Sequence, residues 1–400
     1  MRSNWRQISL NEITELVIDH RGRTPKKLGG CWSDSGYRTL SAKNVKNGQI
    51  VQSDTIRFVD EDLYRKWMKE EIKRGDILIT SEAPFGQLYY WDSDEKIVLG
   101  QRLFGLRIKD EYDARFIYYY MMTREFQEEL KGRATGTTVI GLRQPELMKC
   151  SIRCPDITTQ HRIASVFKTI DTKILINENI NDNLQRQAEL LYHDRFETVD
   201  RSNLPVNWRI VRLGDVAIIS KKSFNPAKEP EILLEHYSIP AFDEAHFPVF
   251  ELSTAIKSNK FIVDSTCFMI SKLNPTTKRV WKPYCLTENS VCSTEFIVYK
   301  AKRQEITDFL YSVIDSSSFS DFMCSHVTGS TGSRQRTTPS DTLAFKLILP
   351  TAEEIAEYQG IVTPMFKQIK CNAIENDNLN RLRDSLLPKL MNGEIDVSAI

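Results

Sequence analysis

The chain has 400 residues, which is enough for two or three domains that each bury a sizeable core. Its 54 lysines and arginines face 53 aspartates and glutamates, and the net charge of +1 excludes a uniformly basic nucleic-acid-binding protein. Any binding to nucleic acid must therefore come from local basic patches. With 41% hydrophobic and 27% charged residues, the composition is that of an ordinary globular protein.

Nothing in the sequence predicts a membrane segment or a disulfide scaffold. The longest apolar run, residues 116–122, is far shorter than the roughly 20 residues that a membrane span needs. The first ten residues lack the apolar core of a signal peptide. The eight cysteines form no CxxC pair, so buried free thiols are expected rather than a zinc site. We expect a cytoplasmic protein without membrane contacts or a bound metal.

The first 155 residues have mixed α/β character and carry a basic patch. A β-rich run at 76–80 and a helical stretch at 114–130 are separated by turns rich in glycine, proline and serine. Within residues 20–49, seven lysines and arginines against one aspartate give a local charge of +6. Basic loops with interleaved aromatic residues suit a DNA backbone and groove edges, whereas a solvated surface loop is the alternative. The DNA-binding candidates in this patch are Arg21, Arg23, Lys26, Lys27, Arg38 and Lys43.

A hinge rich in glycine and threonine follows at residues 131–138. Small residues let backbone amides approach phosphates, and an arginine can add a bidentate contact to guanine. A plain interdomain loop would have the same composition. The candidates from this hinge are Arg133, Thr135 and Thr137, and Arg102 is a further candidate for reading bases.

Residues 156–198 have the pattern of one long helix, with Asp156 as the expected N-cap. Steps of four and three residues from Ile163 trace an apolar seam that two asparagines interrupt, which is the spacing of a coiled coil. The predicted seam residues are Ile163, Phe167, Ile170, Ile174, Asn177, Leu184 and Leu191.

The second half of the chain repeats this layout. The segment NDNLQR at 181–186 returns as NDNLNR 195 residues later, and the opening Trp5-Arg6 returns as Trp208-Arg209. The chain is therefore predicted to be two copies of one α/β unit, with a second domain at 199–350 and a second helix at 351–400.

The second domain has its own basic patch and hinge. Six lysines and arginines against one aspartate give +5 within residues 256–282, and a hinge rich in serine, glycine and arginine lies at 328–336. Two patches, one in each copy of a neutral protein, favour nucleic-acid binding over a solvated loop. The candidates here are Lys272, Lys278, Arg279, Trp281, Lys282, Ser330, Arg334 and Arg336.

The second helix begins with a predicted capping box formed by Thr351 and Glu354, and Pro364 predicts a kink or a restart within it. Asparagines recur at two seam positions in both copies, and a polar seam residue fixes the register of paired helices. This favours two helices that pack on each other, while two amphipathic helices that cover separate domain cores remain the alternative. The predicted seam residues are Val362, Met365, Ile369, Asn372, Leu379 and Leu386.

The motifs of a catalytic site are missing from the sequence. There is no glycine-rich nucleotide loop and no GxxxxGK[ST] phosphate loop. The triplet Asp94, Glu95 and Lys96 fits only half of a nuclease motif, and the segment from Asn274 lacks the second proline and the aromatic residue of an amino-methyltransferase motif. The sequence therefore predicts a binding protein without catalytic residues or a cofactor.

Several short motifs, taken in order, resemble those of the specificity (S) subunits of type I restriction-modification systems. They are the GRTP at 22–25, KRGDIL at 73–78, GQR at 100–102, TGTT at 135–138 and LPKLMNGEI at 387–395, together with the half-length repeat. The second copy departs from this pattern, because it has no Gly-x-Thr-Pro after Trp208 and has CSTE at 292–295 in place of GQR.

This resemblance implies an α/β (α+β) protein with target-recognition domains at 1–155 and 199–350. The helices at 156–198 and 351–400 would form an antiparallel coiled coil between them. Each domain would read one part of a split double-stranded DNA target, and the helices would dock two methyltransferase (M) subunits. Adenosylmethionine would be held by the M subunits, and ATP and magnesium by restriction (R) subunits. The main alternatives are a self-contained DNA methyltransferase or nuclease with diverged motifs, and a structural scaffold that touches no DNA.

Overall fold

The structure is a computed structural model that describes residues 5–46, 48–136, 140–328 and 335–397. The chain forms two compact units. Unit 1 combines Met1–Thr172 with Leu379–Ile400, and unit 2 is Lys173–Asn378. Both long helices are shared between the units, so the predicted limits at 155, 198 and 350 fall near helix ends and not at the boundaries of the units.

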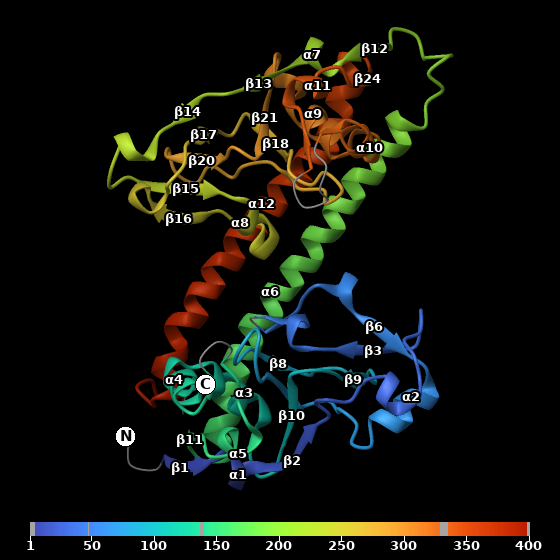
Figure 1. The fold of residues 1–400 in the computed structure, drawn as a ribbon. Helices are drawn as coiled ribbons and strands as arrows, with labels where there is room; N and C mark the ends of the chain where they lie inside the picture. Colours follow the sequence, from blue (N-terminus) through green and yellow to red (C-terminus); the bar gives the residue numbers. More distant parts are fainter. Residues whose placement is uncertain (1–4, 47, 137–139, 329–334, 398–400) are drawn as a thin grey trace. The chain divides into compact units, whose positions relative to one another are not determined.

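Unit 1 is built on a four-stranded antiparallel sheet with the order β2-β10-β7-β8 (Figure 1). A second sheet has the order β6-β3-β9, and β1 and β4 pair with β11 and β5. The strands are β1 Arg6–Ser9, β2 Thr14–Asp19, β3 Tyr37–Leu40, β4 Val45–Lys46, β5 Gln49–Ile50, β6 Arg57–Val59, β7 Ile77–Thr80, β8 Leu88–Tyr90, β9 Val98–Leu99, β10 Leu103–Ile108 and β11 Ser151–Cys154.

Unit 2 repeats the four-stranded sheet as β13-β21-β18-β19, again antiparallel throughout. Its second sheet is larger, with the order β14-β17-β20-β15-β16, and β12 pairs with β24. The strands are β12 Arg209–Arg212, β13 Ala217–Ser220, β14 Ser223–Phe224, β15 Leu233–Tyr237, β16 Val249–Leu252, β17 Lys260–Ile262, β18 Cys267–Ser271, β19 Val280–Trp281, β20 Ser290–Ser293, β21 Phe296–Ala301, β22 Val327–Thr328, β23 Arg336–Thr337 and β24 Lys346–Leu349.

The helical stretch predicted at 114–130 is divided at one residue, and so is the equivalent stretch of unit 2. In unit 1 Thr123 is extended and its hydroxyl accepts a hydrogen bond from Phe126 N, which starts a new helix. Ser316 does the same in unit 2 through Phe319 N. The helices other than the two long ones are α1 Leu10–Ile13, α2 Glu61–Trp67, α3 Ala114–Met122, α4 Arg124–Gly132, α5 Gln144–Leu147, α7 Leu213–Val216, α8 Ile239–Ala245, α9 Thr307–Asp315, α10 Ser317–Ser325 and α11 Pro339–Thr342.

The two long helices are α6, Ile157–Tyr192, and α12, Ala352–Met391. The predicted caps are confirmed, because Asp156 accepts a hydrogen bond from Thr159 N and the Thr351 hydroxyl accepts one from Glu354 N. The expected restart at Pro364 is wrong, since α12 runs through it without a break. Pro364 lies on the exposed face, where water can bind the carbonyl that its missing N–H leaves free.

The two helices pack on each other in antiparallel register. In unit 2, Asn177 Nδ2 donates to Asn376 Oδ1 at 2.8 Å, and Asn372 Nδ2 donates to Asn181 Oδ1 at 2.8 Å. All thirteen predicted seam residues are buried or half-buried. The coiled-coil prediction is confirmed.

The ends of the helices also enter the domain cores. Phe167 of α6 and Leu390 of α12 belong to the core of unit 1, and Tyr192 and Tyr358 to the core of unit 2. The helices therefore pack on each other along one part of their length and cover the domain cores at their ends. No helix in the described part of the chain is long and apolar enough to cross a membrane.

One buried histidine lies in each unit. His20 is 2% exposed and His236 is 8% exposed. Burial lowers the pKa of His20, as does the nearby Arg23. Burial also lowers the pKa of His236, although its contact with Glu251 opposes the shift. Both imidazoles are therefore neutral at pH 7.

Candidate nucleic-acid interface

The described residues at and after the predicted hinge of unit 1 lie against the end of strand β7. Thr135 and Gly141 form a two-way backbone bridge, with N–O distances of 2.9 and 2.8 Å. Leu142 N then donates to Ser81 O at 3.0 Å, and Ser81 N donates to Arg102 O at 2.8 Å. The hinge, the end of β7 and the start of β10 thus form one continuous edge, which we call the hairpin edge.

Unit 2 has the same hairpin edge. Strands β22 and β23 close the second hinge, Thr337 N donates to Lys272 O at 3.1 Å, and Lys272 N donates to Glu295 O at 2.9 Å. The two hinges, recognised in the sequence by composition alone, therefore occupy equivalent places in the two sheets. The candidates Thr137, Ser330 and Arg334 lie outside the described residues.

The hairpin edge of unit 1 borders a hollow of about 330 Å³. Arg21 reaches it with its guanidinium fixed, because Nε and Nη2 each donate to Asp19 at 2.8 Å and the group stacks 4.0 Å from the Phe104 ring centre. Arg102 Nε lies 2.9 Å from Glu82 Oε1. Arg102 has a backbone φ of +63°, in the left-handed region that residues with a side chain rarely adopt.

The hairpin edge of unit 2 carries Arg336, whose Nε and Nη2 lie 3.0 and 3.1 Å from the carboxylate oxygens of Glu295. That contact raises the pKa of Arg336, which stays charged at any working pH. Lys272 lies half-buried on the same edge. Each unit thus presents an arginine from this edge that a glutamate holds in place.

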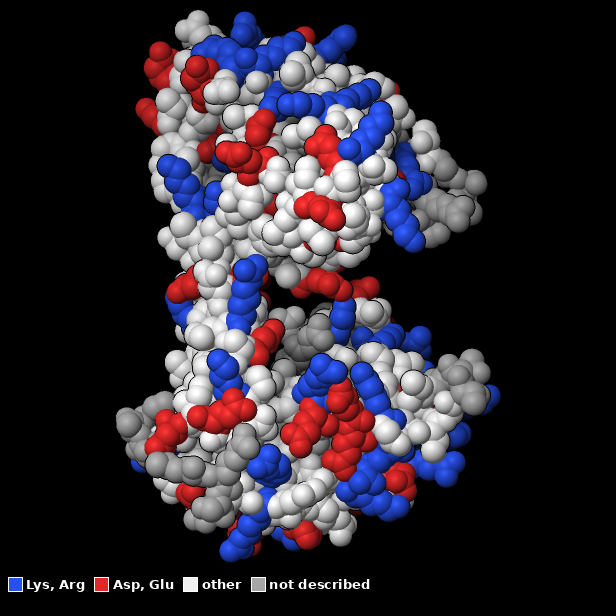
Figure 2. All heavy atoms as spheres, turned by 90° about the vertical axis from the view of Figure 1, so that its left-hand side faces the viewer, with Lys and Arg blue, Asp and Glu red and all other residues white. Residues whose placement is uncertain are grey.

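Among the remaining candidates of the first patch, the arginines form hydrogen bonds within unit 1 and the lysines are exposed. Arg23 donates to the Trp67 carbonyl, and Arg38 Nε donates to Glu95 at 2.6 Å. Lys26 and Lys43 are exposed, as is Lys27, which donates to Gly22 O at 2.8 Å. On the face drawn in Figure 2, cationic side chains lie among aspartates and glutamates and do not form a uniformly basic surface.

Five candidates have structural roles that sequence composition did not reveal. Trp281 is 4% exposed and packs in a core of unit 2, which excludes it from contact with DNA in this fold. Lys278 Nζ bonds to Glu189 of α6 and to buried Asp315, and Lys282 pairs with Asp308. The burial of Trp281 corrects that prediction, whereas the paired cationic side chains stay predictions as DNA contacts. Their ion pairs form because long side chains in a local basic run can turn toward carboxylates elsewhere in the chain. The other two are Arg279, paired with Asp243, and Arg133, paired with Glu129 within α4.

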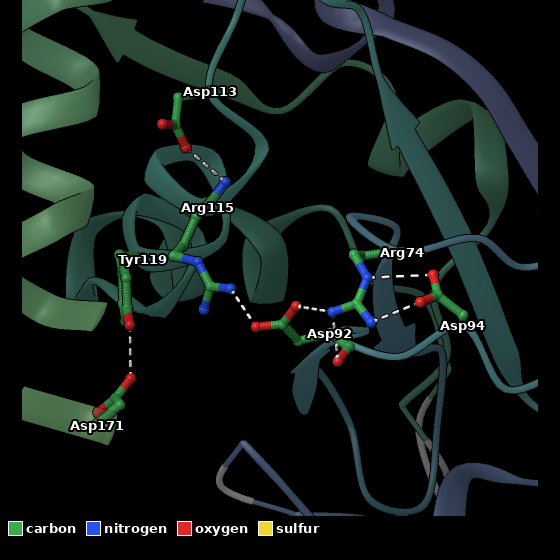
Figure 3. A network of polar contacts seen from close by, with 7 residues as sticks. All are labelled: Arg74, Asp92, Asp94, Asp113, Arg115, Tyr119 and Asp171. Atoms are coloured by element: carbon green, nitrogen blue, oxygen red, sulfur yellow. Dashed lines mark hydrogen bonds and ion pairs between the residues drawn. The ribbon is translucent and has the colours of Figure 1, made fainter. Parts of the chain in front are cut away.

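A network of polar contacts connects the sheet of unit 1 to its long helices (Figure 3). Arg74 bridges Asp92 and Asp94, and Asp92 also pairs with Arg115 at 2.7 Å on α3. The Tyr119 hydroxyl of α3 donates to Asp171 of α6 at 2.6 Å. Asp171 in turn pairs with Arg383 of α12 at 3.2 Å, so the position of both helices is fixed relative to the sheet within this unit.

The same contacts account for the half nuclease motif. Asp94 pairs with Arg74, Glu95 with Arg38 and Lys96 with Glu71, so these charges stabilise the surface of unit 1. In the part of the chain that the structure describes, no three histidine, cysteine or acidic side chains come together as metal ligands would.

Four residues at the hairpin edges were missed by sequence reasoning. Glu82 and Glu295 hold the two arginines, while Gln101 and Arg143 line the hollow of unit 1. Acidic residues are not expected in a basic DNA-binding patch, so neither glutamate was considered. The pairing of each with an arginine distant in sequence cannot be seen in the sequence pattern.

Comparison with known proteins identifies the fold and a set of similar proteins. A family model described as the type I restriction modification DNA specificity domain matches residues 2–186. The chain is 26% identical, over 439 aligned residues, to the MjaIX specificity subunit of Methanocaldococcus jannaschii, and the match covers 99% of this chain and 95% of that relative. Residues 2–186 thus carry the type I restriction DNA specificity domain, and nearly the whole chain is similar to a type I restriction specificity subunit.

Two further similarities extend this assignment. The HindI specificity subunit of Haemophilus influenzae is 24% identical over 420 residues, covering 82% of this chain and 88% of that relative. The crystal structure of the type I S subunit from M. genitalium has the same fold, with a TM-score of 0.61 at 16% identity over 97% of this chain and 96% of that one. The resemblance drawn from the sequence motifs is confirmed, and so is the fold class of a specificity subunit.

Proposed function

We propose that this specificity subunit binds a bipartite double-stranded DNA target, with one half-site read at the hairpin edge of each unit. The observation that carries the proposal is the repetition of one edge with the same backbone hydrogen bonds and a held arginine in both units. Arginine is the side chain that most often reads guanine in the major groove. Exposed Lys26, Lys27 and Lys43 would contact phosphates and position unit 1 on the duplex.

The paired helices would set the distance between the half-sites. Helix α6 has 36 residues, and at 1.5 Å per residue it is about 54 Å long. Two reading edges that face the same side of a duplex favour half-site centres about one helical turn, or ~10 base pairs, apart. Because each edge covers only a few base pairs, the intervening sequence would be unspecified.

Two M subunits and the R subunits would be the partners of this chain. Three large apolar side chains of α6 within unit 2 support docking on the helices, since Leu175, Ile176 and Ile180 are 56%, 47% and 41% exposed. The chain itself would hold no cofactor and perform no catalysis. Adenosylmethionine would be bound by the M subunits, and ATP with magnesium by the R subunits.

The test is to co-express the chain with its M subunit, purify the complex and map methylated adenines across the host genome. We expect one split motif with a spacer of constant length. Methylation at a continuous motif, or no co-purification, would refute the proposal.

A self-contained DNA methyltransferase or nuclease is the alternative. Calorimetry of the isolated chain with adenosylmethionine separates the two, because a specificity subunit should give no heat of binding. A tight one-to-one isotherm would favour the alternative.

A further inference from the structure

Each of the two hairpin edges carries a glutamate–arginine ion pair at the surface. In unit 1 Glu82 and Arg102 pair at 2.9 Å, with side chains 33% and 50% exposed. In unit 2 Glu295 and Arg336 pair at 3.0 Å, with side chains 28% and 43% exposed. Both pairs therefore lie at the surface with part of each group open to a ligand.

The internal repeat alone does not produce this coincidence. The matching backbone bonds equate Ser81 with Lys272 and Arg102 with Glu295, so an arginine in unit 1 corresponds to a glutamate in unit 2. The residue that follows Lys272, and so matches Glu82, is Leu273. Each unit has built its pair from different strands and loops.

The free hydrogen-bonding atoms of such a pair match one base pair. Arg102 Nε lies 2.9 Å from Glu82 Oε1, and Nε and Nη2 of Arg336 donate to Glu295. Because a guanidinium carries five N–H donors, the terminal N–H groups that do not face the carboxylate can still donate in both pairs. In the major groove a G·C pair presents two adjacent acceptors, guanine N7 and O6, and then the cytosine amino donor. The guanidinium fits the two acceptors, and the carboxylate beside it fits the amino group.

The same pair discriminates against the other ligands of a DNA surface. An A·T pair presents an amino donor directly beside adenine N7, so a second guanidinium N–H would face another donor. A phosphate would be repelled by the carboxylate, which cancels the charge of the arginine. The pair is therefore suited to a base edge and poorly suited to the backbone.

We infer that Glu82–Arg102 and Glu295–Arg336 each read one G·C base pair, one in each half of the target. The inference rests on the proposed function, because it names the bases that the two edges select. The two arginines come from different elements, since Arg102 precedes β10 in unit 1 and Arg336 begins β23 in unit 2.

The experiment compares methylation maps of complexes that contain the wild-type chain, Arg102→Ala, Glu82→Gln, Arg336→Ala or Glu295→Gln. Arg124→Ala is the matched control, because Arg124 is a 90% exposed arginine that pairs with Glu128 within α4 and does not line the hollow of unit 1. Co-purification with the M subunit and thermal melting confirm that each variant is folded.

The wild-type motif should contain a G·C pair in each half. Arg102→Ala should relax that position in one half only, with discrimination reduced about 5- to 150-fold, and Arg336→Ala should do so in the other half only. The glutamate variants should relax the same two positions by smaller factors, and the control should leave the motif unchanged. This inference alone would be overturned if the motif lacked G·C in either half, or if neither arginine variant altered its specificity. The proposed function would be overturned if the wild-type complex showed no split motif.

Discussion

Replacing one asparagine of the pair between α6 and α12 should lower the free energy of unfolding, whereas replacing both with apolar residues should leave it nearly unchanged. Asn177 is 1% exposed, and its Nδ2 donates to Asn376 Oδ1 at 2.8 Å and to Glu375 Oε2 at 2.7 Å. Asn177→Leu leaves the half-buried Asn376 amide oxygen without its donor, which should lower the free energy of unfolding by about 1–3 kcal/mol.

The double variant Asn177→Leu/Asn376→Leu removes both amides and places two apolar side chains in an apolar seam. Its free energy of unfolding should return to near that of the wild type. Since Asn376→Leu should cost about as much as Asn177→Leu, the coupling energy of the cycle should be about 2–6 kcal/mol. Urea unfolding of the full chain, followed by circular dichroism at 222 nm, measures all four forms. Asn183→Leu, at an exposed position of α6, is the control and should change stability by less than about 0.5 kcal/mol.

Strictly additive costs in the double variant would refute the reasoning, because they would show that the two amides do not depend on each other. Replacement of the second pair as well, Asn181 with Asn372, should leave the helices stable but without the polar contacts that fix their register. Methylation maps of that four-residue variant should then show spacers of more than one length.

Three further predictions follow from the helices, the basic patch and the buried histidines. Duplicating residues 181–184 together with the facing residues 369–372 adds one turn, about 6 Å, to both helices. Methylation maps should then show a spacer longer by one or two base pairs, with both half-sites unchanged. An unaltered spacer in an active complex would mean that the helices do not set the distance between the half-sites. Neutralising Lys26 and Lys27 should flatten the slope of log affinity against log salt by up to about 1.8, measured by fluorescence anisotropy, and an unchanged slope would place both lysines away from DNA. Because the two buried histidines have lowered pKa values, the unfolded chain binds more protons below about pH 6.5. The free energy of unfolding measured by urea should therefore fall between pH 7 and pH 5.5, by at most about 1.4 kcal/mol per pH unit for each histidine. A variant with glutamine at both positions should show a smaller fall than the wild type, and an equal fall would contradict the prediction.

The features that the sequence determined are those encoded by local periodicity and by repetition. The heptad seam, its asparagines and the caps at Asp156 and Thr351 depend on residues within a few positions of one another, and they correctly placed both long helices. The half-length repeat predicted two similar α/β units, and the structure has two sheets of identical strand order. The composition of the hinges located two equivalent hairpin edges because turn-forming residues act locally.

Only the tertiary structure decided which charges are available to a ligand. Trp281 and Lys278 lie in a basic run, yet one is buried and the other bonds to Glu189 and Asp315, residues that are 89 and 37 positions away. In the same way Glu82 and Glu295 became part of the candidate site only when folding brought each beside an arginine from another strand. A charge count along the chain gives the sum of the charges, but pairing and burial depend on long-range contacts, and these determine which side chains can meet DNA.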